Sequence, residues 1–406
     1  MNNSILADAC NIKTGKLDSN QAVKGGQFPF FTCSALPDTI DKYAYDEDVV
    51  LVAGNNAQGN FHVSRFKGKF NAYQRTYILT AKHDYDIDFI YYSLKLELKR
   101  LKEKSQGSQT KFLTMPILNS IVLRKLNKTL QQKIASVLTA LDSKIELNNR
   151  INAELESMAK MLYDYWFVQF DFPDKKGKPY KTSGGKMVWN EELKREIPEG
   201  WVVKLLRTEI EIQRGISYTS KEINGDGIPM INLNSFNLDG TYKSEGVKTY
   251  SGKFSEKNIV KSGDLLIAAT DVTRNADIIG RAILVPDYYK EHLVFSMDIA
   301  KILSESIPYS FLMMLFNSAH YHNYIKWFAT GTIVLHLNLD GVNRYQTELP
   351  PTNLMKQFDD FYLPIANRIY MTAKENEKLT KLRDWLLPML MNGQVKVNDK
   401  IVQSEV

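Results

Sequence analysis

The chain has 406 residues, of which 44% are hydrophobic and 24% are charged, and its net charge at pH 7 is +6. This composition is typical of globular proteins and excludes a disordered polypeptide, and at about 150 residues per domain the length allows two or three domains. No apolar run reaches the roughly 18 uncharged residues of a membrane-spanning helix. Two cysteines, Cys10 and Cys33, are expected to be reduced thiols in a cytoplasmic protein.

The first globular segment alternates strand candidates with one helix candidate. The stretches "VVLVAG", "RTYILTA" and "SIVLRKL" are rich in Val, Ile and Leu and predict strands, whereas "IDFIYYSLKLELKRLKEK" predicts a helix. Residues 1–126 contain 17 basic and 12 acidic side chains, a balance that is compatible with a nucleic-acid partner. This segment is therefore predicted to be an α+β domain.

A long helix is predicted next, from Thr129 to Phe170, because apolar residues recur there without proline or glycine. Thr129 and Gln132 offer a capping box at its start. At about 1.5 Å per residue this helix would be roughly 60 Å long. Residues 171–204 are rich in Gly, Pro and Lys and are interpreted as a linker.

The second globular segment repeats this organisation. "DLLIAAT", "RAILVP" and "MDIAKIL" are strand candidates, and "SFLMMLFNSAHYHNYIKWFA" predicts a helix. Residues 205–351 contain 14 basic and 16 acidic side chains, so binding to nucleic acid would require a local basic face. A second long helix is predicted after Pro350 and Pro351, ending near Gly393.

The sequence contains an internal repeat. The stretch that begins at Gly107 aligns with the stretch that begins at Gly331, at one constant offset in residue number and without a gap. A weaker similarity relates "FPFFTCSAL" to "IPMINLNSF" and "EDVVLVAG" to "GDLLIAAT". The long helices share a heptad frame of the kind found in coiled coils. The predicted seam consists of Ile134, Leu141, Asn148, Leu155 and Leu162 in the first helix and Phe358, Ile365, Thr372, Leu379 and Leu386 in the second.

Each helix has one apolar seam, so the two helices are expected to pack against each other, in antiparallel directions because the second globular segment begins where the first helix ends. The polar breaks Asn148 and Thr372 would then meet near the midpoints of the seams and fix the register at some cost in stability. The alternative is that both are exposed polar gaps in imperfect heptads.

Polar side chains that could contact DNA follow the predicted strands and helices of both globular segments. Asn and Gln suit adenine edges, Arg suits guanine, and Lys, hydroxyl and glycine-rich loops suit phosphates. The alternative for each loop is a solvated surface turn. The candidates are Asn55, Asn56, Gln58, Arg65, Lys104, Ser108 and Lys111 in the first segment and Arg214, Thr270, Arg274, Asn275, Lys326, Thr330, Thr332 and His336 in the second.

The chain resembles the specificity (S) subunits of type I restriction-modification systems. "LQQKIASVLTALDSKIELNNRINAELESMAKMLYDYWFVQF" is similar to the central helical region of that family, "IPEGW" to the start of its second recognition domain, and "LTKLRDWLLPMLMNGQVKV" to its C-terminal helical region. The sequence departs from the family where "LRKL" replaces the usual "PLPP" before the first helix.

The resemblance implies a non-catalytic DNA-binding subunit. Two target-recognition domains would each recognise half of a bipartite DNA site, and two antiparallel helices would act as a spacer. Two methyltransferase subunits would dock on the chain, S-adenosylmethionine would be bound by those partners and not by this chain, and a translocating endonuclease subunit can join. The expected fold is α+β, divided into residues 1–126, 127–170, 171–204, 205–351, 352–395 and 396–406 as domain, helix, linker, domain, helix and tail.

Two functions of other classes remain as alternatives. Asp174, Glu192 and Lys194 could form a metal-dependent nuclease site, because two carboxylates beside a lysine suit phosphodiester hydrolysis. A helical scaffold that does not bind DNA is the other alternative. The six histidines do not form a metal-binding set with the two cysteines, so no metal is expected.

Overall fold

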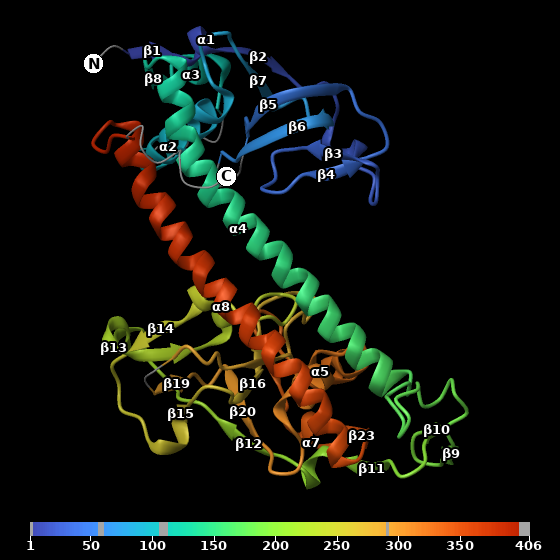
Figure 1. Cartoon of the computed structure of the whole chain (residues 1–406). Coiled ribbons are helices and arrows are strands. Elements are labelled where there is room, and N and C mark those ends of the chain that lie inside the picture. Colours follow the sequence, from blue (N-terminus) through green and yellow to red (C-terminus); the bar gives the residue numbers. More distant parts are fainter. Residues whose placement is uncertain (1–2, 56–60, 105–112, 290–291, 398–406) are drawn as a thin grey trace. The chain divides into compact units, whose positions relative to one another are not determined.

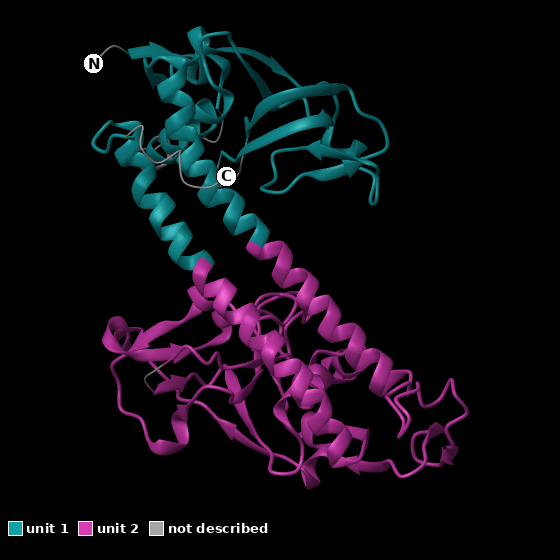
Figure 2. Cartoon of the chain, viewed as in Figure 1, with its two compact units in different colours: residues 1–147, 376–406 teal, residues 148–375 magenta. Residues whose placement is uncertain are grey.

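The computed structural model describes residues 3–55, 61–104, 113–289 and 292–397 (Figure 1). The chain forms two compact units, each built from globular elements and from parts of two long helices (Figure 2). Unit 1 contains residues 1–147 and 376–406, and unit 2 contains residues 148–375. The mixture of small sheets and long helices confirms the predicted fold class. No helix within the described ranges is long and apolar enough to cross a membrane.

The main sheet of unit 1 has six strands in the order β2-β7-β5-β6-β3-β4. All neighbours are antiparallel except β3 and β6, which are parallel. The predicted strands at "VVLVAG" and "RTYILTA" are confirmed as parts of β5 and β7. The strand bounds are β2 (Cys10–Thr14), β3 (Phe28–Phe31), β4 (Asp38–Ile40), β5 (Tyr45–Ala53), β6 (Val63–Ala72) and β7 (Thr76–Ala81).

Helix α2 (Ile87–Lys104) covers one face of this sheet and begins and ends at the predicted residues. Val50 and Val52 of β5 pack with Ile90 on this face, whereas Val49 and Leu51 belong to the cluster on the opposite face. Both faces of β5 are therefore buried, which explains its uninterrupted apolar run. A separate pair of strands, β1 (Asn3–Ile5) and β8 (Val122–Arg124), lies near the short helices α1 (Leu6–Ala9) and α3 (Met115–Asn119).

Unit 2 repeats the strand order of unit 1. Its sheet β12-β20-β16-β18 corresponds to β2-β7-β5-β6, and β13 pairs in parallel with β19 as β3 does with β6. One long strand, β6, therefore takes the place of both β18 and β19, and β19 joins a second sheet, β14-β13-β19-β15. The bounds are β12 (Glu211–Arg214), β13 (Ile223–Ile231), β14 (Lys248–Tyr250), β15 (Ile259–Val260), β16 (Leu265–Ala268), β18 (Ala282–Leu284), β19 (Leu293–Phe295) and β20 (Ile299–Leu303).

In each unit, one glycine allows two backbone segments to approach closely at the equivalent place. A Cβ on Gly15 would lie 2.2 Å from the carbonyl oxygen of Ala72, and a Cβ on Gly215 would lie 2.2 Å from that of Ser296. Both follow the first strand of their sheet, where only glycine lets the two backbones meet. The internal repeat thus extends from the sequence to the backbone packing.

The remaining elements of unit 2 include one departure from prediction. The single predicted helix "SFLMMLFNSAHYHNYIKWFA" is divided into α5 (Tyr309–Asn317) and α6 (Ala319–Ile325) at Ser318, whose hydroxyl accepts a hydrogen bond of 3.2 Å from the amide of Tyr321. An N-cap interaction of this kind restarts a helix after a turn. The short elements are β9 (Met187–Asn190), β10 (Arg195–Pro198), β11 (Val202–Leu205), β17 (Thr270–Asp271), β21 (Ala329–Thr330), β22 (Leu335–Leu337), β23 (Gln346–Leu349) and α7 (Asp340–Asn343).

Residues 171–204, interpreted from sequence as a linker, are ordered and belong to unit 2. They contain the β9–β10 hairpin. Phe172 stacks on Tyr180 and on Trp201, with ring centroids 4.6 and 5.6 Å away. Aromatic packing therefore holds a segment whose glycine, proline and lysine content predicted only a connection.

The two long helices are α4 (Lys128–Tyr163), which continues into a π-helical turn (Asp164–Val168), and α8 (Thr352–Met391). The predicted start of the first helix at Thr129 was wrong. The side chain of Asn127 caps the helix, because its Oδ1 accepts a hydrogen bond of 2.8 Å from the amide of Leu130. The predicted end of α8 is confirmed, since Gly393 adopts a positive φ of 74° just after the helix.

Contacts within each unit show that α4 and α8 are antiparallel, as predicted. In unit 1, Asp142 pairs with Arg383 at 2.7 Å. In unit 2, the amide of Asn148 donates a hydrogen bond of 2.9 Å to Glu375, and that of Asn152 donates one of 3.3 Å to the carbonyl of Ile369. Residue numbers rise along one helix and fall along the other.

The predicted seam residues are all at least partly buried. Ile134, Asn148, Phe358 and Thr372 are fully buried, and Leu141, Leu155, Leu162, Ile365, Leu379 and Leu386 are half-buried. The polar breaks are 2% and 3% exposed, so neither is a solvated gap. Thr372 satisfies its hydroxyl within its own helix, by donating a hydrogen bond of 2.7 Å to the carbonyl of Arg368.

Candidate nucleic-acid interface

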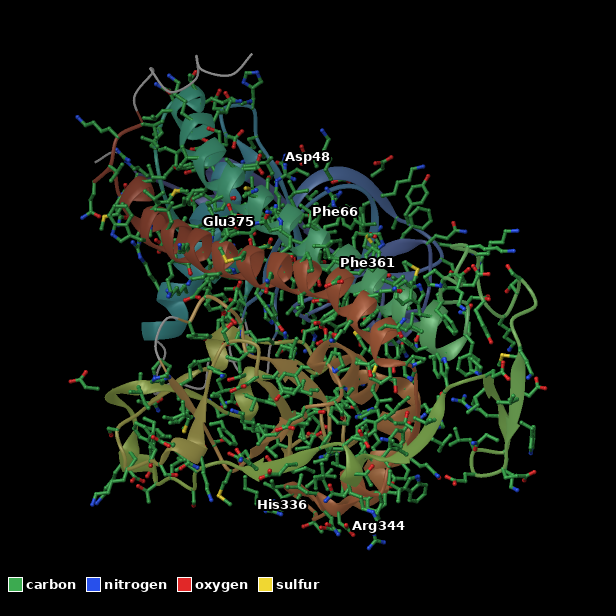
Figure 3. The ribbon with its side chains drawn as sticks, turned by 60° about the horizontal axis from the view of Figure 1, so that its bottom comes forward. Asp48, Phe66, His336, Arg344, Phe361 and Glu375 are labelled. Carbon is green, nitrogen blue, oxygen red and sulfur yellow. The ribbon has the colours of Figure 1, made fainter. Side chains whose placement is uncertain are left out.

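A three-stranded sheet in unit 2 brings together most of the candidate residues of the second segment. Its strand order is β17-β22-β21, so two loops that are well separated in the sequence share one sheet. His336 of β22 is paired with Thr270 of β17 on one side and with Thr330 of β21 on the other. Figure 3 shows His336 near the surface of the unit.

The side chains of this sheet differ in their access to solvent. Those exposed are Arg274, Asn275, Thr330, Thr332 and His336. Thr270, in contrast, is 5% exposed, and its hydroxyl donates a hydrogen bond of 3.4 Å to the carbonyl of Asp298. Thr270 is therefore a structural residue. For the five exposed side chains, contact with DNA stays a prediction.

The loop that carries Arg274 and Asn275 is held rigidly by Asp271, which the sequence analysis did not select. One carboxylate oxygen of Asp271 accepts a hydrogen bond of 2.7 Å from the amide of Thr273, and the other accepts bonds of 2.7 and 3.0 Å from the amides of Ile278 and Ile279. A buried carboxylate that satisfies three amides fixes the path of a loop. The exposed side chains are thus presented on a preorganised backbone.

Two further candidates of the second segment lie elsewhere or are less accessible. Arg214 is exposed, but it ends β12 and is paired with Ala300 in a different sheet. Lys326 is half-buried and begins a 3₁₀ turn (Lys326–Phe328) that precedes β21. The structure therefore does not bring all eight candidates into one sheet.

The candidates of the first segment are only partly described. Asn55 is half-buried and follows β5. Asn56, Gln58, Ser108 and Lys111 lie outside the described residues, and Lys104 is the last residue of α2, with a side chain that is likewise outside the description.

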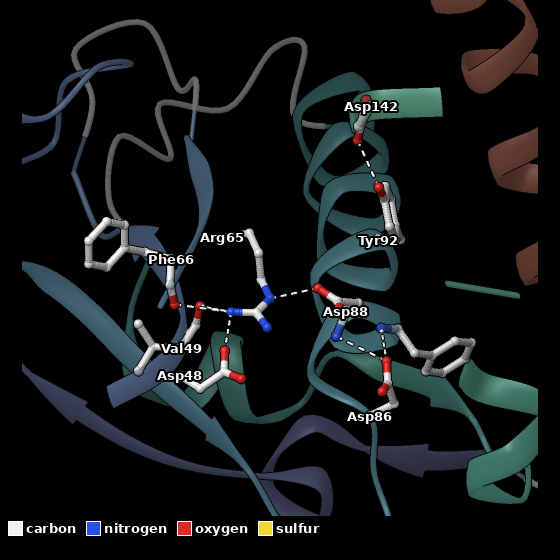
Figure 4. Close-up of polar contacts among 9 residues, drawn as sticks. Asp48, Val49, Arg65, Phe66, Asp86, Asp88, Tyr92 and Asp142 are labelled. Atoms are coloured by element: carbon white, nitrogen blue, oxygen red, sulfur yellow. Dashed lines mark hydrogen bonds and ion pairs between the residues drawn. The ribbon is translucent and has the colours of Figure 1, made fainter. Parts of the chain in front are cut away.

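Arg65 is engaged inside unit 1 (Figure 4). Its guanidinium forms ion pairs with Asp48 and, at 2.6 Å, with Asp88. It also donates hydrogen bonds of 3.2 and 3.0 Å to the carbonyls of Val49 and Phe66. A guanine contact would require at least one of these interactions to break, so the geometry gives Arg65 the role of joining α2 to β5 and β6.

Arg75 is a more accessible arginine in unit 1 that the sequence analysis missed. It is exposed and has no ion-pair partner among the residues described. It lines a hollow of about 390 Å³ together with Thr14, Gly54, Gln74 and Thr114. The signal in the sequence was its position in the β6–β7 turn, before "TYILTA".

The proposed nuclease residues do not form a common site. The carboxylate of Asp174 accepts the amides of Lys176 and Lys178 at 2.7 and 2.8 Å, and these bonds hold its pKa below the ordinary value. Glu192 accepts a hydrogen bond from Gln346, and Lys194 pairs with Glu191 at 2.9 Å. Within the described part of the chain, no group of three or more His, Cys, Asp or Glu could hold a metal ion.

The long helices also expose large apolar side chains, and these occur at equivalent positions of the internal repeat. The constant offset of the repeat relates Leu147 to Met371, Met158 to Leu382 and Met161 to Trp385. All six are between 40% and 60% exposed. Unit 1 contains Leu147, Leu382 and Trp385, and unit 2 contains Met158, Met161 and Met371. We call these two sets the apolar helix faces.

Comparison with known proteins gives a consistent result. Residues 1–157 match the family model described as "Type I restriction modification DNA specificity domain". The chain is 26% identical over 325 residues to the type I restriction enzyme MjaIX specificity subunit of Methanocaldococcus jannaschii, covering 77% of this chain and 70% of the relative. It is 34% identical over 157 residues to the EcoDI specificity subunit of Escherichia coli, covering 39% of this chain and 34% of the relative.

The fold has a solved counterpart. The type I restriction-modification S subunit from M. genitalium superimposes with a TM-score of 0.63 at 15% identity, and the match covers 96% of each chain. This likeness shows that the chain shares the fold of that S subunit. Residues 1–157 thus match a DNA specificity domain of type I restriction-modification systems, and the chain is similar over most of its length to a specificity subunit of such a system.

Proposed function

We propose that this chain recognises a bipartite DNA target, with one half-site for each unit. The observation that carries the proposal is the repetition of one architecture in both units, down to the same strand order and the paired close approaches at Gly15 and Gly215. Two similar recognition units in one chain suit a target that consists of two short sequences.

In unit 2, base contacts are assigned to Arg274 and Asn275, with Thr330, Thr332 and His336 as further DNA contacts. Arginine suits the O6 and N7 atoms of guanine, and asparagine suits adenine. The rigid loop that Asp271 holds supports this assignment, because a preorganised contact loses less entropy on binding. In unit 1, the segment around Asn55 and the exposed Arg75 are the corresponding candidates.

The apolar helix faces are proposed to bind two methyltransferase subunits, one on each face. Exposed apolar patches on helices are typical of protein interfaces. Because the two faces occupy equivalent repeat positions, both would accept the same partner. S-adenosylmethionine would be bound by those partners, which would methylate adenine in each half-site, and a translocating endonuclease subunit can join the assembly.

The central experiment is co-expression of this chain with its neighbouring methyltransferase, followed by single-molecule sequencing of methylated adenines in the host DNA. The expected result is a split motif that is methylated on both strands. Methylation that shows no sequence motif would refute the recognition of a bipartite target.

Arg274→Ala tests the assignment of the unit 2 half-site. Loss of a bidentate contact should cost about 1 to 3 kcal/mol and relax one position of the motif. Arg207→Ala is the matched control, since Arg207 is also an exposed arginine of unit 2 but lies in another turn. Equal weakening on all DNA sequences would instead assign Arg274 to phosphate contacts.

Native mass spectrometry of the purified complex tests the docking proposal. Trp385→Ser should reduce the number of bound methyltransferases from two to one, and the combination with Met161→Ser should remove both. Trp189→Ser is the matched control, because Trp189 is 56% exposed but lies in β9. Complexes that retain two methyltransferases in the double variant would place the interface elsewhere.

A further inference from the structure

One end of the three-stranded sheet in unit 2 presents apolar side chains to solvent where polar ones are expected. Val272 is 64% exposed, Ile333 is 85% exposed and Val334 is 38% exposed. Asp271 pairs with Leu335, so Val272 and Val334 are the next residues outward at the same end of the sheet, and Ile333 lies in the turn between β21 and β22. We call these three residues the apolar tip.

The apolar tip is held in place on both sides. Gly331 begins the turn with a φ of +128°, and a Cβ there would lie 2.1 Å from the carbonyl oxygen of Val334, so the turn is tight and requires glycine. Val272 directly follows Asp271, whose carboxylate is bound to the amides of its own loop. The turn and the loop therefore keep the tip at the surface, where a ligand can cover it.

The surroundings of the tip match DNA. Arg274 and Asn275 follow Val272, and Thr332 precedes Ile333, and all three polar side chains are exposed. Arg274 has no ion-pair partner among the residues that the structure describes. A free guanidinium and small polar groups around an apolar projection complement a groove bordered by phosphates.

We propose that Ile333 acts as a wedge that enters a groove of the half-site bound by unit 2 and partly unstacks one base step, with Val272 and Val334 packed against the opened bases. This inference rests on the proposed function, because it requires that unit 2 binds a half-site. Apolar wedges of this kind kink DNA at flexible steps. The wedge makes pyrimidine–purine steps preferable at that position, so it adds specificity without a hydrogen bond to a base.

The internal repeat predicts a difference between the two units at the position of the wedge. Its constant offset places Gln109 and Thr110 at the positions of Ile333 and Val334. The first copy therefore has polar residues where the second has the wedge. The unstacked step is expected in the half-site of unit 2 and not in that of unit 1.

The test uses the complex of this chain with its methyltransferase. The DNA duplexes carry, in unmethylated form, the sequence motif that the methylation experiment identifies. 2-Aminopurine is placed at each position of both half-sites, and its fluorescence reports unstacking. The wild-type complex should give an unstacking signal at one step of one half-site, separate from the signal of the target adenine that the methyltransferase flips. Ile333→Gln, which copies the residue of the first repeat, should abolish the first signal and keep the second.

Affinity provides an independent measurement. A mismatch at that step removes the cost of unstacking, so the wild-type complex should bind the mismatched duplex about tenfold more tightly than the intact one, whereas Ile333→Gln should show no such gain. Leu238→Gln is the matched control, because Leu238 is 64% exposed in a turn of unit 2 outside this sheet, and it should behave like the wild type.

The outcomes separate the wedge from the function on which it rests. Equal unstacking signals in wild type and Ile333→Gln would overturn the wedge while the recognition motif stands. An equal loss of affinity for intact and mismatched duplexes in Ile333→Gln would also overturn it, because the tip would then contact DNA without opening a step. A wild-type complex that methylates no motif would refute the proposed function itself.

Discussion

The two units pack the same pair of helices in different ways. In unit 1, Asp142 of α4 pairs with Arg383 of α8, and the hydroxyl of Tyr92 donates a hydrogen bond of 2.8 Å to Asp142. The repeat offset places Ala366 and Ala159 at these positions in unit 2, and each alanine is 4% exposed. The positions of the ion pair in unit 1 are therefore occupied in unit 2 by two small, buried, apolar residues of one core cluster.

Aromatic packing accompanies the alanines of unit 2. Phe358 is fully buried, and its ring centroid lies 5.9 Å from that of Tyr163, 6.2 Å from Trp166 and 5.2 Å from Phe167. The comparison shows that equivalent positions of a helix pair accept either an ion pair or buried small apolar residues when the neighbouring side chains are adapted.

The largest effect is expected from Phe358→Ala, which leaves a cavity in the aromatic cluster of unit 2. Loss of a buried phenylalanine should lower the free energy of unfolding by about 3 to 5 kcal/mol, as measured by urea denaturation. Phe361→Ala is the control, because Phe361 lies one turn away on α8 and is 57% exposed (Figure 3). Similar destabilisation by both variants would show that the cluster does not depend on its centre.

Removing the charge pair of unit 1 tests the comparison directly. Asp142→Ala leaves Arg383 paired, among the described residues, with its exposed neighbour Asp384, and should cost about 2 kcal/mol because both partners are incompletely buried. The double variant Asp142→Ala and Arg383→Ala copies unit 2 and should be less destabilised than the sum of the single variants. Additive losses in the double-mutant cycle would contradict a direct coupling of the two residues.

Acid should destabilise unit 2 through His322, which is 5% exposed. Burial, assisted by the nearby charges of Arg281 and Lys326, lowers the pKa of His322 to about 4 from an ordinary 6.5. The unfolded chain therefore binds this proton more readily, and stability is lost as pH falls from 6.5 toward 4. His322→Gln should flatten that part of the stability profile; an unchanged slope would mean that other groups control it.

The smallest losses of stability are expected from substitution of the two polar residues of the seam. Asn148→Ala removes the hydrogen bond to Glu375 and should cost about 1 kcal/mol. Thr372→Val removes a hydroxyl that donates a hydrogen bond to a carbonyl of its own helix and should cost less. The measurement is the unfolding temperature of each variant. A lower unfolding temperature for Thr372→Val than for Asn148→Ala would mean that the hydroxyl of Thr372, and not the amide of Asn148, carries the interaction between the helices.

Sequence reasoning succeeded where the determining pattern is local or periodic. Runs rich in Val, Ile and Leu predicted β5 and β7, and recurring apolar residues without Pro or Gly predicted the first long helix, because these patterns are recorded directly in residue order. The antiparallel packing followed from the direction of the chain. These features did not require knowledge of any partner distant in sequence.

The candidate site was harder to predict, since accessibility depends on distant partners. Arg65 follows a polar loop and has the chemistry of a base contact, but Asp88, which binds it, lies 23 residues away on α2. Asp271 was not among the residues selected from the sequence, yet its hydrogen bonds with the amides of Ile278 and Ile279 shape the loop. Loop polarity indicated where polar side chains gather, and only the fold distinguishes exposed side chains from structural ones.

The division of unit 1 between residues 1–147 and 376–406 has a consequence for synthesis of the protein on the ribosome. Unit 2 is continuous in sequence and can fold as soon as residue 375 has emerged. Unit 1 must wait, because Leu390 and Met391 complete the cluster that contains Phe89 and Ile134. The apolar surface of α2 and α4 is thus exposed to chaperones and proteases throughout elongation, and completion of that cluster marks a chain translated through α8.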